Sequence, residues 1–219
     1  MAELLVLQAF DSLFPIGAFT MSNGLESYVR NGLVNDRVSL EAYLAACLYL
    51  LPYNDLGAAA LTANGGVIAE LDILLHASKT PRELRDGSRK LCLRFLRAQL
   101  ALGDYPLLES YHAAIASGAS YGHYALAVGL FVREVQAELS FALNAYCYSL
   151  LSATVNHAVK LVPLRQGDGQ AALRAAMCGV SNAVTLSMRI TPAELGVSGA
   201  GFNLRSMQHE RLEGRLYIT

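Results

Sequence analysis

The sequence has little charge and no excess of either sign. Only 16% of its 219 residues are Asp, Glu, Lys or Arg, against about 25% in a typical soluble domain. The 17 Lys and Arg nearly balance the 18 Asp and Glu, so no overall positive field would attract a nucleic acid or an anionic membrane. We expect neither as a partner. A surface with so little charge is instead typical of a chain that binds another protein, a second copy or a ligand.

Targeting and membrane signals are also missing. No Lys or Arg precedes the short apolar run at the N-terminus, which argues against a secretory signal. The strongest candidate for a membrane span, residues 139–159, contains Asn144, Asn156 and His157, which hydrocarbon would disfavour. We therefore predict a core helix there and a cytoplasmic protein. The cysteines form no C-x-x-C pair and are expected to be buried free thiols; they are Cys47, Cys92, Cys147 and Cys178.

The motifs of several enzyme classes are absent. The sequence has no G-x-S-x-G, no H-E-x-x-H and no P-loop, and its five histidines are dispersed. We predict a protein that is not an enzyme, with no metal site and no bound cofactor. One remote alternative is a small helical-bundle enzyme, which would have to use Glu138, Asn144 and His157 on the helix predicted over 137–162.

Helical periodicity dominates the chain, and strand-like alternation is not sustained anywhere. We predict a single all-α domain of about nine or ten helices around the apolar helix 137–162. Two segments, Thr80-Pro81-Arg82-Glu83 and Thr191-Pro192-Ala193-Glu194, carry helix start signals. The helices are expected at 23–31, 39–51, 53–63, 66–77, 82–102, 106–117, 122–134, 137–162 and 168–189.

Three segments contain residues that a simple connection between helices would not require. The first, residues 11–26, makes a Phe-Pro-Ile-Gly turn, after which Ser22 can cap a helix and Glu26 can meet its positive end. The second, residues 160–170, gathers polar donors at a helix–loop–helix joint. The third, residues 196–219, follows the domain 1–195 as a flexible tail hinged by glycines, and we expect it to dock onto a partner.

These segments together resemble the UreF family of urease accessory proteins. The matching pieces occur in family order across nearly the whole chain. They are Phe14-Pro15-Ile16-Gly17-Ala18-Phe19 with Ser22, Gly24, Leu25 and Glu26; Ser120-Tyr121-Gly122-His123-Tyr124-Ala125; Val162-Pro163-Leu164 with Gln166, Asp168, Gly169 and Gln170; and Ser206-Met207-Gln208-His209-Glu210 leading to Arg215-Leu216-Tyr217.

The resemblance implies a non-catalytic scaffold that is needed for nickel insertion into apo-urease. Such a scaffold would form a homodimer, bind a UreD/UreH-type accessory protein and recruit the GTPase UreG, so that nickel and GTP are handled by its partners. An alternative within the family is an active regulator of that GTPase, and the rate of GTP hydrolysis with and without the chain would discriminate between the two.

The resemblance also implies roles for particular residues. Phe19 and Arg215 are assigned to the dimer interface. The partner-binding residues are Lys160, Arg165, Gln166, Asp168 and Gln170 at the joint, with Met207, His209 and Glu210 in the tail. The motif residues expected to shape the first segment are Phe14, Pro15, Gly17, Ser22, Gly24 and Glu26.

Overall fold

The computed structural model describes all 219 residues and confirms the all-α class. It contains eleven α-helices, three short 3-10 helices and no strand. The α-helices are α1 (Ala2–Ala9), α2 (Leu25–Arg30), α3 (Arg37–Leu50), α4 (Asp55–Ala63), α5 (Ile68–Ser78), α6 (Arg82–Leu100), α7 (Pro106–Ala116), α8 (Tyr124–Glu134), α9 (Leu139–Leu161), α10 (Gln166–Ser187) and α11 (Ala200–His209). The 3-10 helices are η1 (Ala18–Thr20), η2 (Leu51–Tyr53) and η3 (Pro192–Glu194).

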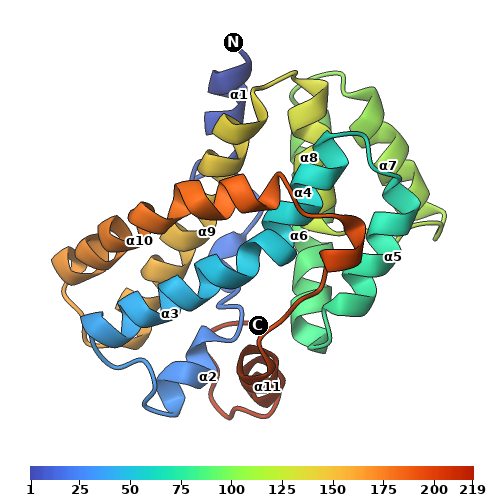
Figure 1. Cartoon of the computed structure of the whole chain (residues 1–219). Helices are drawn as coiled ribbons and strands as arrows, with labels where there is room; N and C mark the ends of the chain where they lie inside the picture. The colour runs from blue at the N-terminus through green and yellow to red at the C-terminus, as the bar shows by residue number, and fades with distance from the viewer.

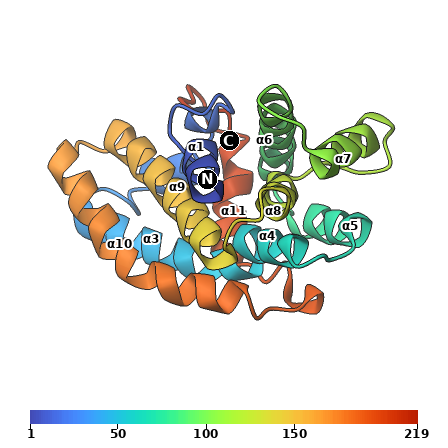
Figure 2. The same cartoon turned by 90° about the horizontal axis from the view of Figure 1, so that it is seen from above.

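The helices form two groups that share one core. Helices α3, α9 and α10 pack side by side in one half of the molecule, and α4 to α8 make up the other half (Figures 1 and 2). Helix α4 joins the groups, because it contacts α8 on one side and α9 and α10 on the other. Helices α2 and α11 lie against each other below this body (Figure 1).

The predicted central helix is present as α9, but it is not the most enclosed one. It contacts α1, α2, α3, α4 and α10. One side of it remains partly exposed, and Tyr148 is 45% exposed. The most enclosed helix is α8, in which every residue from Tyr124 to Val132 is buried. Its all-round apolar sequence is typical of a helix surrounded by others.

Predicted helix boundaries agree with the structure to within a few residues, and three local expectations are wrong. Helix α1 lies in the N-terminal run, for which we had predicted no helix. The Thr191 signal opens only the three-residue helix η3, although its capping box forms. At α6 the N-cap is Pro81 with no side-chain cap, so Glu83 does not cap that helix.

The membrane candidate also differs from the expected one. The segment that meets the length and hydropathy criteria for a span is Arg37–Ala63, not 139–159. It comprises α3 and α4, which are interrupted by η2 with Pro52, and 44% of its apolar window is buried inside the protein. Packing within the fold therefore accounts for part of its apolar composition.

All four cysteines are free thiols, as predicted, but only two are buried. Cys92 and Cys147 lie in the core, Cys47 is half-buried and Cys178 is exposed on α10. The uniform burial that we expected is therefore wrong, because Cys178 lies on the outer side of α10.

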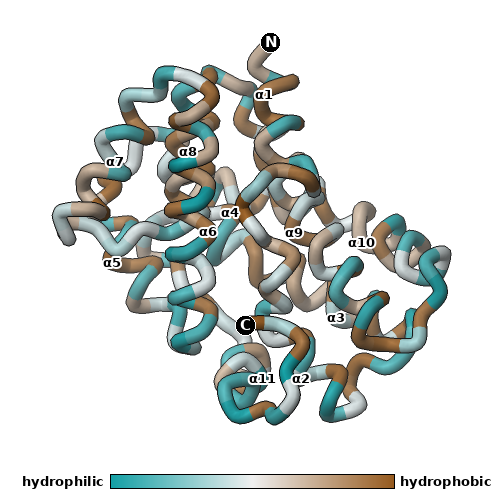
Figure 3. Tube along the Cα trace, turned by 180° about the vertical axis from the view of Figure 1, so that it is seen from behind, coloured by the Kyte–Doolittle hydropathy of each residue, from teal (hydrophilic) through white to brown (hydrophobic).

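The tail is not a loose segment, contrary to our expectation. Helix α11 packs against α2 and α6, and the residues after it return to the body, where Tyr217 and Thr219 are buried. In Figure 3 the α11 coil is largely coloured as hydrophilic, which agrees with a short helix that buries only Ser206 and His209 fully.

The closest helix contact gives a test of the fold. A Cβ atom added to Gly129 on α8 would lie 2.6 Å from Thr62 Cβ and even nearer to the Ala59 carbonyl on α4. Gly129→Ala should therefore lower the free energy of unfolding by about 2–3 kcal/mol, measured by urea denaturation. The control Gly201→Ala, in open space on α11, should be neutral or stabilising by up to about 1 kcal/mol. Equal stabilities would contradict this packing.

Candidate functional site

Glu26 is the point at which the tail is anchored to the body. Its side chain is buried, and its carboxylate accepts hydrogen bonds from the backbone N–H groups of Leu216 at 2.9 Å and Tyr217 at 3.1 Å. Burial alone would raise the pKa of Glu26, but these donors and His209 outweigh it and hold the pKa below the ordinary value. We had expected Glu26 to meet only the positive end of its own helix.

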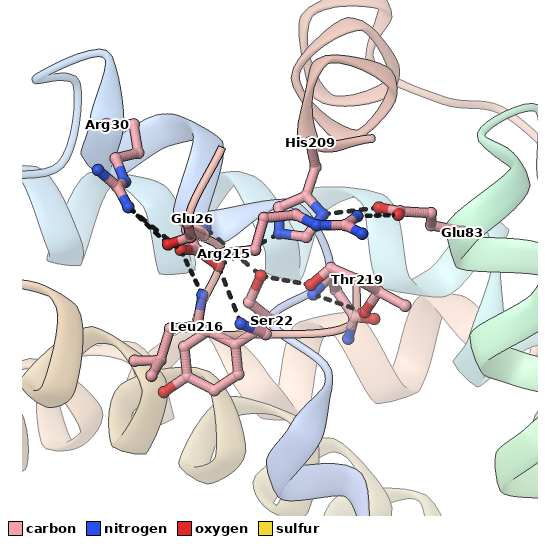
Figure 4. A network of polar contacts seen from close by, with 11 residues as sticks. Ser22, Glu26, Arg30, Glu83, His209, Arg215, Leu216 and Thr219 are labelled. Carbon is pink, nitrogen blue, oxygen red and sulfur yellow. Dashed lines mark hydrogen bonds and ion pairs between the residues drawn. The ribbon is translucent and has the colours of Figure 1, made fainter. Parts of the chain in front are cut away.

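His209 on α11 lies between two carboxylates. Its Nε2 is 3.2 Å from Glu26 Oε2 and its Nδ1 is 2.6 Å from Glu83 Oε2, and its side chain is fully buried. The two ring nitrogens of His209 thus each face one carboxylate. His209 therefore links α2 to α6 through the tail (Figure 4), and its side chain is not on the surface in this structure.

The rest of the tail is held by further ion pairs and by its backbone. Arg215 donates to Glu83 Oε1. Further along, the Thr219 carbonyl accepts from Ser22 Oγ at 2.5 Å and from the Ser22 backbone N–H at 2.8 Å. Ser22 therefore binds the tail more closely than it binds α2, whose Glu26 N–H lies 3.4 Å from Ser22 Oγ (Figure 4).

Two motif glycines allow the first segment to approach its neighbours closely, and one of them faces the tail. Gly24 has a φ of +87°, and a Cβ there would collide with Ser206 Oγ on α11. Gly17 has a φ of +74°, and a Cβ there would meet the Arg94 guanidinium, which binds the Ile16 carbonyl at 3.1 Å. Of the other motif residues, Phe14 is buried beside Phe95, whereas Pro15 is exposed.

The seam between tail and body is incompletely hydrogen-bonded. Four buried polar atoms along it have no hydrogen-bond partner within the protein: Ser27 Oγ, His157 Nε2, Ser206 Oγ and Tyr217 OH. An unpaired buried polar group costs about 1–3 kcal/mol. The tail is therefore held by a few charged contacts rather than by a fully satisfied interface.

The structure brings Lys160 and Phe19 to the same end of the molecule as the tail. Lys160 lines a pocket of about 460 Å³ with Leu216 and Glu26. The backbone of Phe19 hydrogen-bonds to His157, one turn before Lys160 on α9. Phe19 is 67% exposed and Leu216 is 62% exposed. The predicted dimer residue Phe19 and the predicted partner residue Lys160 thus lie at one end of the molecule.

The remaining joint residues lie at the start of α10. Gln166 and Gln170 are exposed and line, with Lys160 and Phe19, a groove of about 1160 Å³ along α9. Asp168 does not cap the helix from outside; it lies in the first turn, where its carboxylate accepts from the Arg165 backbone N–H at 3.3 Å. Arg165 is 91% exposed.

In the tail, Met207 is 42% exposed, and Glu210 pairs with Arg82 at 3.1 Å.

The residues of the Tyr121-Gly122-His123 motif make hydrogen bonds within the fold. Asp72 on α5 accepts from the backbone N–H groups of Tyr121 and Gly122 and from Tyr111 OH. His123 Nδ1 lies 3.2 Å from Ser88 Oγ, and its Nε2 lies 3.2 Å from His76. The motif therefore fixes the loop before α8. Nowhere in the chain do three His, Cys, Asp or Glu side chains gather as they would around a metal ion.

Sequence reasoning missed Glu83 as a member of the site. Its carboxylate receives both His209 and Arg215, but in the sequence it completes a local capping pattern, and its partners are 126 and 132 positions away. The only signal for its role was the unusual concentration of charge on α6.

Comparison with known proteins decides the family. The UreF family model matches residues 23–177. The chain belongs to the UreF family of urease accessory proteins. It is 34% identical over 218 residues to the urease accessory protein UreF of Arthrobacter sp. (strain FB24), covering 99% of this chain and 97% of that protein.

Other UreF proteins match equally fully. That of Actinobacillus pleuropneumoniae serotype 3 (strain JL03) is 35% identical over 221 residues, covering 98% of this chain and 97% of the relative. That of Haemophilus influenzae (strain ATCC 51907 / DSM 11121 / KW20 / Rd) is 33% identical over 222 residues, covering 98% and 94%. The resemblance inferred from the motifs is therefore confirmed, and the UreF matches include both the first segment and the tail.

The His209 contacts generate a prediction for this UreF-family chain. His209→Gln should release the tail, because the glutamine amide lacks the two opposite ring nitrogens with which His209 contacts both Glu26 and Glu83. Hydrogen exchange at Leu216 and Tyr217 should accelerate, and the free energy of unfolding should fall by about 1–3 kcal/mol. The control His112→Gln, at a half-buried histidine outside this network, should change neither. Unchanged exchange in the tail would show that His209 does not hold it.

Two other histidines predict how stability depends on pH. Burial lowers the pKa of His157 from 6.5 to about 4 and that of His123 from 6.5 to about 2. Below pH 6.5 these two histidines bind protons in the unfolded chain but not in the folded chain, so their contribution to stability falls as the pH drops and is constant above 6.5. The free energy of unfolding should decrease by about 1.4 kcal/mol per pH unit for each histidine.

The histidine origin of this slope can be checked by denaturation between pH 7 and pH 5. His157→Gln should lose about half of the pH dependence, because glutamine does not titrate. A stability that does not change over this interval would contradict the neutral, buried state of both histidines.

Proposed function

We propose that this chain is a cytoplasmic, non-catalytic scaffold that promotes nickel insertion into apo-urease. The observation that carries the proposal is similarity, over 98–99% of the chain, to proteins named urease accessory protein UreF. In this proposal the chain forms a homodimer, binds a UreD/UreH-type accessory protein and recruits the GTPase UreG. Nickel and GTP are then handled by its partners rather than held as cofactors.

The exposed surface at the tail end supports the proposed interfaces. Several apolar side chains around the docked tail are open to solvent, among them Phe19, Leu216, Ile218 at 47% and Met207. Ile218 lies beside Phe19 because its backbone N–H donates to the Thr20 carbonyl. Exposed apolar side chains that adjoin one another in this way are typical of protein interfaces. We assign Phe19 and Arg215 to the dimer contact.

We assign partner binding to two regions next to this surface. Lys160 with the exposed residues Arg165, Gln166 and Gln170 forms the first, and its turn is held by Asp168. The second is the outer side of α11, where Met207 is exposed and Glu210 pairs with Arg82. His209 is buried, so its role in this proposal is to fix α11 in place rather than to touch the partner.

Complementation tests the proposal as a whole. The chain is co-expressed with a urease operon from which the corresponding accessory gene has been deleted, and nickel-dependent ureolysis is measured together with co-purification of the accessory proteins. Restored ureolysis with co-purifying partners is the expected result. Loss of both, with the protein folded, would contradict the scaffold proposal.

The dimer assignment makes a separate prediction about Arg215. Arg215→Ala should weaken self-association at least about tenfold, as expected for an interface arginine, and should abolish urease activation while the monomer stays folded. Light scattering and the ureolysis assay measure the two effects.

Glu83→Gln is the control for the contact within the chain, because it removes the carboxylate that Arg215 and His209 share but leaves Arg215 available to a partner. A Glu83→Gln variant that still dimerises and activates urease would show that the effect of Arg215→Ala does not come from the lost contact with Glu83. An Arg215→Ala variant that remains dimeric and active would refute the assignment.

A further inference from the structure

Positive charge is concentrated on one helix. Helix α6 carries six of the 17 Lys and Arg residues in the chain and only two carboxylates, Glu83 and Asp86. Its formal charge is therefore positive, whereas the whole chain has a net charge of −1. The six cations are Arg82, Arg85, Arg89, Lys90, Arg94 and Arg97.

These cations form two adjoining rows on α6, which together we call the α6 basic face. Arg82, Arg85 and Arg89 follow one another at spacings of three and four residues, and so do Lys90, Arg94 and Arg97, while Arg89 and Lys90 are consecutive. Five are exposed and Arg85 is half-buried. The opposite side of the helix is buried through Cys92, Phe95, Leu96 and Gln99. Figure 2 shows α6 at the edge of the molecule, with α8 behind it.

Carboxylates neutralise little of this charge. Arg82 is the one cation with a close ion pair, to Glu210 at 3.1 Å, and Arg89 lies 4.0 Å from Asp86. Glu83 is directed to His209 and Arg215 on the tail, so it does not face the neighbouring cations. Lys90 and Arg97 make no hydrogen bond or ion pair within the chain.

Backbone carbonyls, rather than acids, hold three of the guanidinium groups. Arg85 donates to the Lys79 carbonyl at 2.9 Å, Arg89 to the Tyr121 carbonyl at 3.0 Å and Arg94 to the Ile16 carbonyl at 3.1 Å. A carbonyl orients a guanidinium without cancelling its charge. These side chains have therefore already lost much of the conformational freedom that binding would otherwise remove.

We propose that the α6 basic face binds an acidic surface of a partner protein. Five of its six cations are arginines, whose planar guanidinium groups match carboxylates in a bidentate manner. The near-neutral chain gives a polyanion such as a nucleic acid no wider positive field to follow beyond this face. In Figure 2 helix α6 and the start of α10 lie on different sides of the molecule. The α6 basic face is therefore separate from the surface around Lys160.

A defined acidic probe tests the proposal on the full chain. Binding of a labelled polyglutamate peptide is measured by fluorescence anisotropy for the wild type and for the double variant Lys90→Gln, Arg97→Gln, which removes no contact within the fold. The matched control is Arg174→Gln, Arg189→Gln, which removes two exposed positive charges elsewhere. We expect about tenfold weaker binding in the α6 variant alone, together with weakening by added salt.

Each other outcome overturns the proposal. An absence of peptide binding, or equal loss in the two double variants, would show that no specific acidic site exists on α6. Tighter, α6-dependent binding of a labelled oligouridylate of the same charge would assign the face to nucleic acid instead.

A second measurement uses the urease accessory proteins themselves. Complexes captured on the wild-type chain and on both variants are washed with increasing salt, and the α6 variant should release its partner at lower salt than the control. Release of all three at the same salt would overturn a role of the α6 basic face in that assembly. If the wild type captures no accessory protein, the proposed function fails, while the peptide measurement still decides the proposal about α6.

Discussion

The structure depends on how one buried carboxylate is compensated. Glu26 lies in the interior, where an unpaired negative charge would be strongly unfavourable, and all of its close donors come from the last eleven residues of the chain. Leu216 and Tyr217 supply backbone N–H groups, and His209 supplies a ring nitrogen. The helix α2, the helix α11 and the final segment are therefore stable in this arrangement only together, and Glu83 extends the same dependence to α6.

This arrangement explains why the surface at the tail end is composite. The first segment, the C-terminal end of α9 and the last residues of the chain each contribute a few exposed side chains, namely Phe19, Lys160 and Leu216. None of these segments would form such a surface alone. The unsatisfied polar atoms at the seam lower the free energy that docking of the tail contributes to stability. A weakly held tail suits a segment that a partner is proposed to recognise.

The fold class and most helices follow from the sequence because helical periodicity is a local property that survives in the tertiary structure. Helix α1 was missed because eight residues give too short a pattern. The site was only partly predictable. Gly24 and Glu26 were singled out, yet the reason for them, contact with Ser206 and with Leu216, joins positions more than 180 residues apart. Glu83 was misinterpreted because its local pattern indicated a helix cap, and a distant histidine competes for the same carboxylate.

The long separation between Glu26 and His209, 183 positions, has a consequence for biosynthesis. During translation the N-terminal segment leaves the ribosome long before its donors exist, so Glu26 stays hydrated and α2 cannot close over it until the end of the chain is free. Helices α3 to α10 can pack earlier, since their contacts with one another do not involve the tail. The surface at the tail end thus forms after the body, and a nascent chain cannot present it before residues 209–217 have been synthesised.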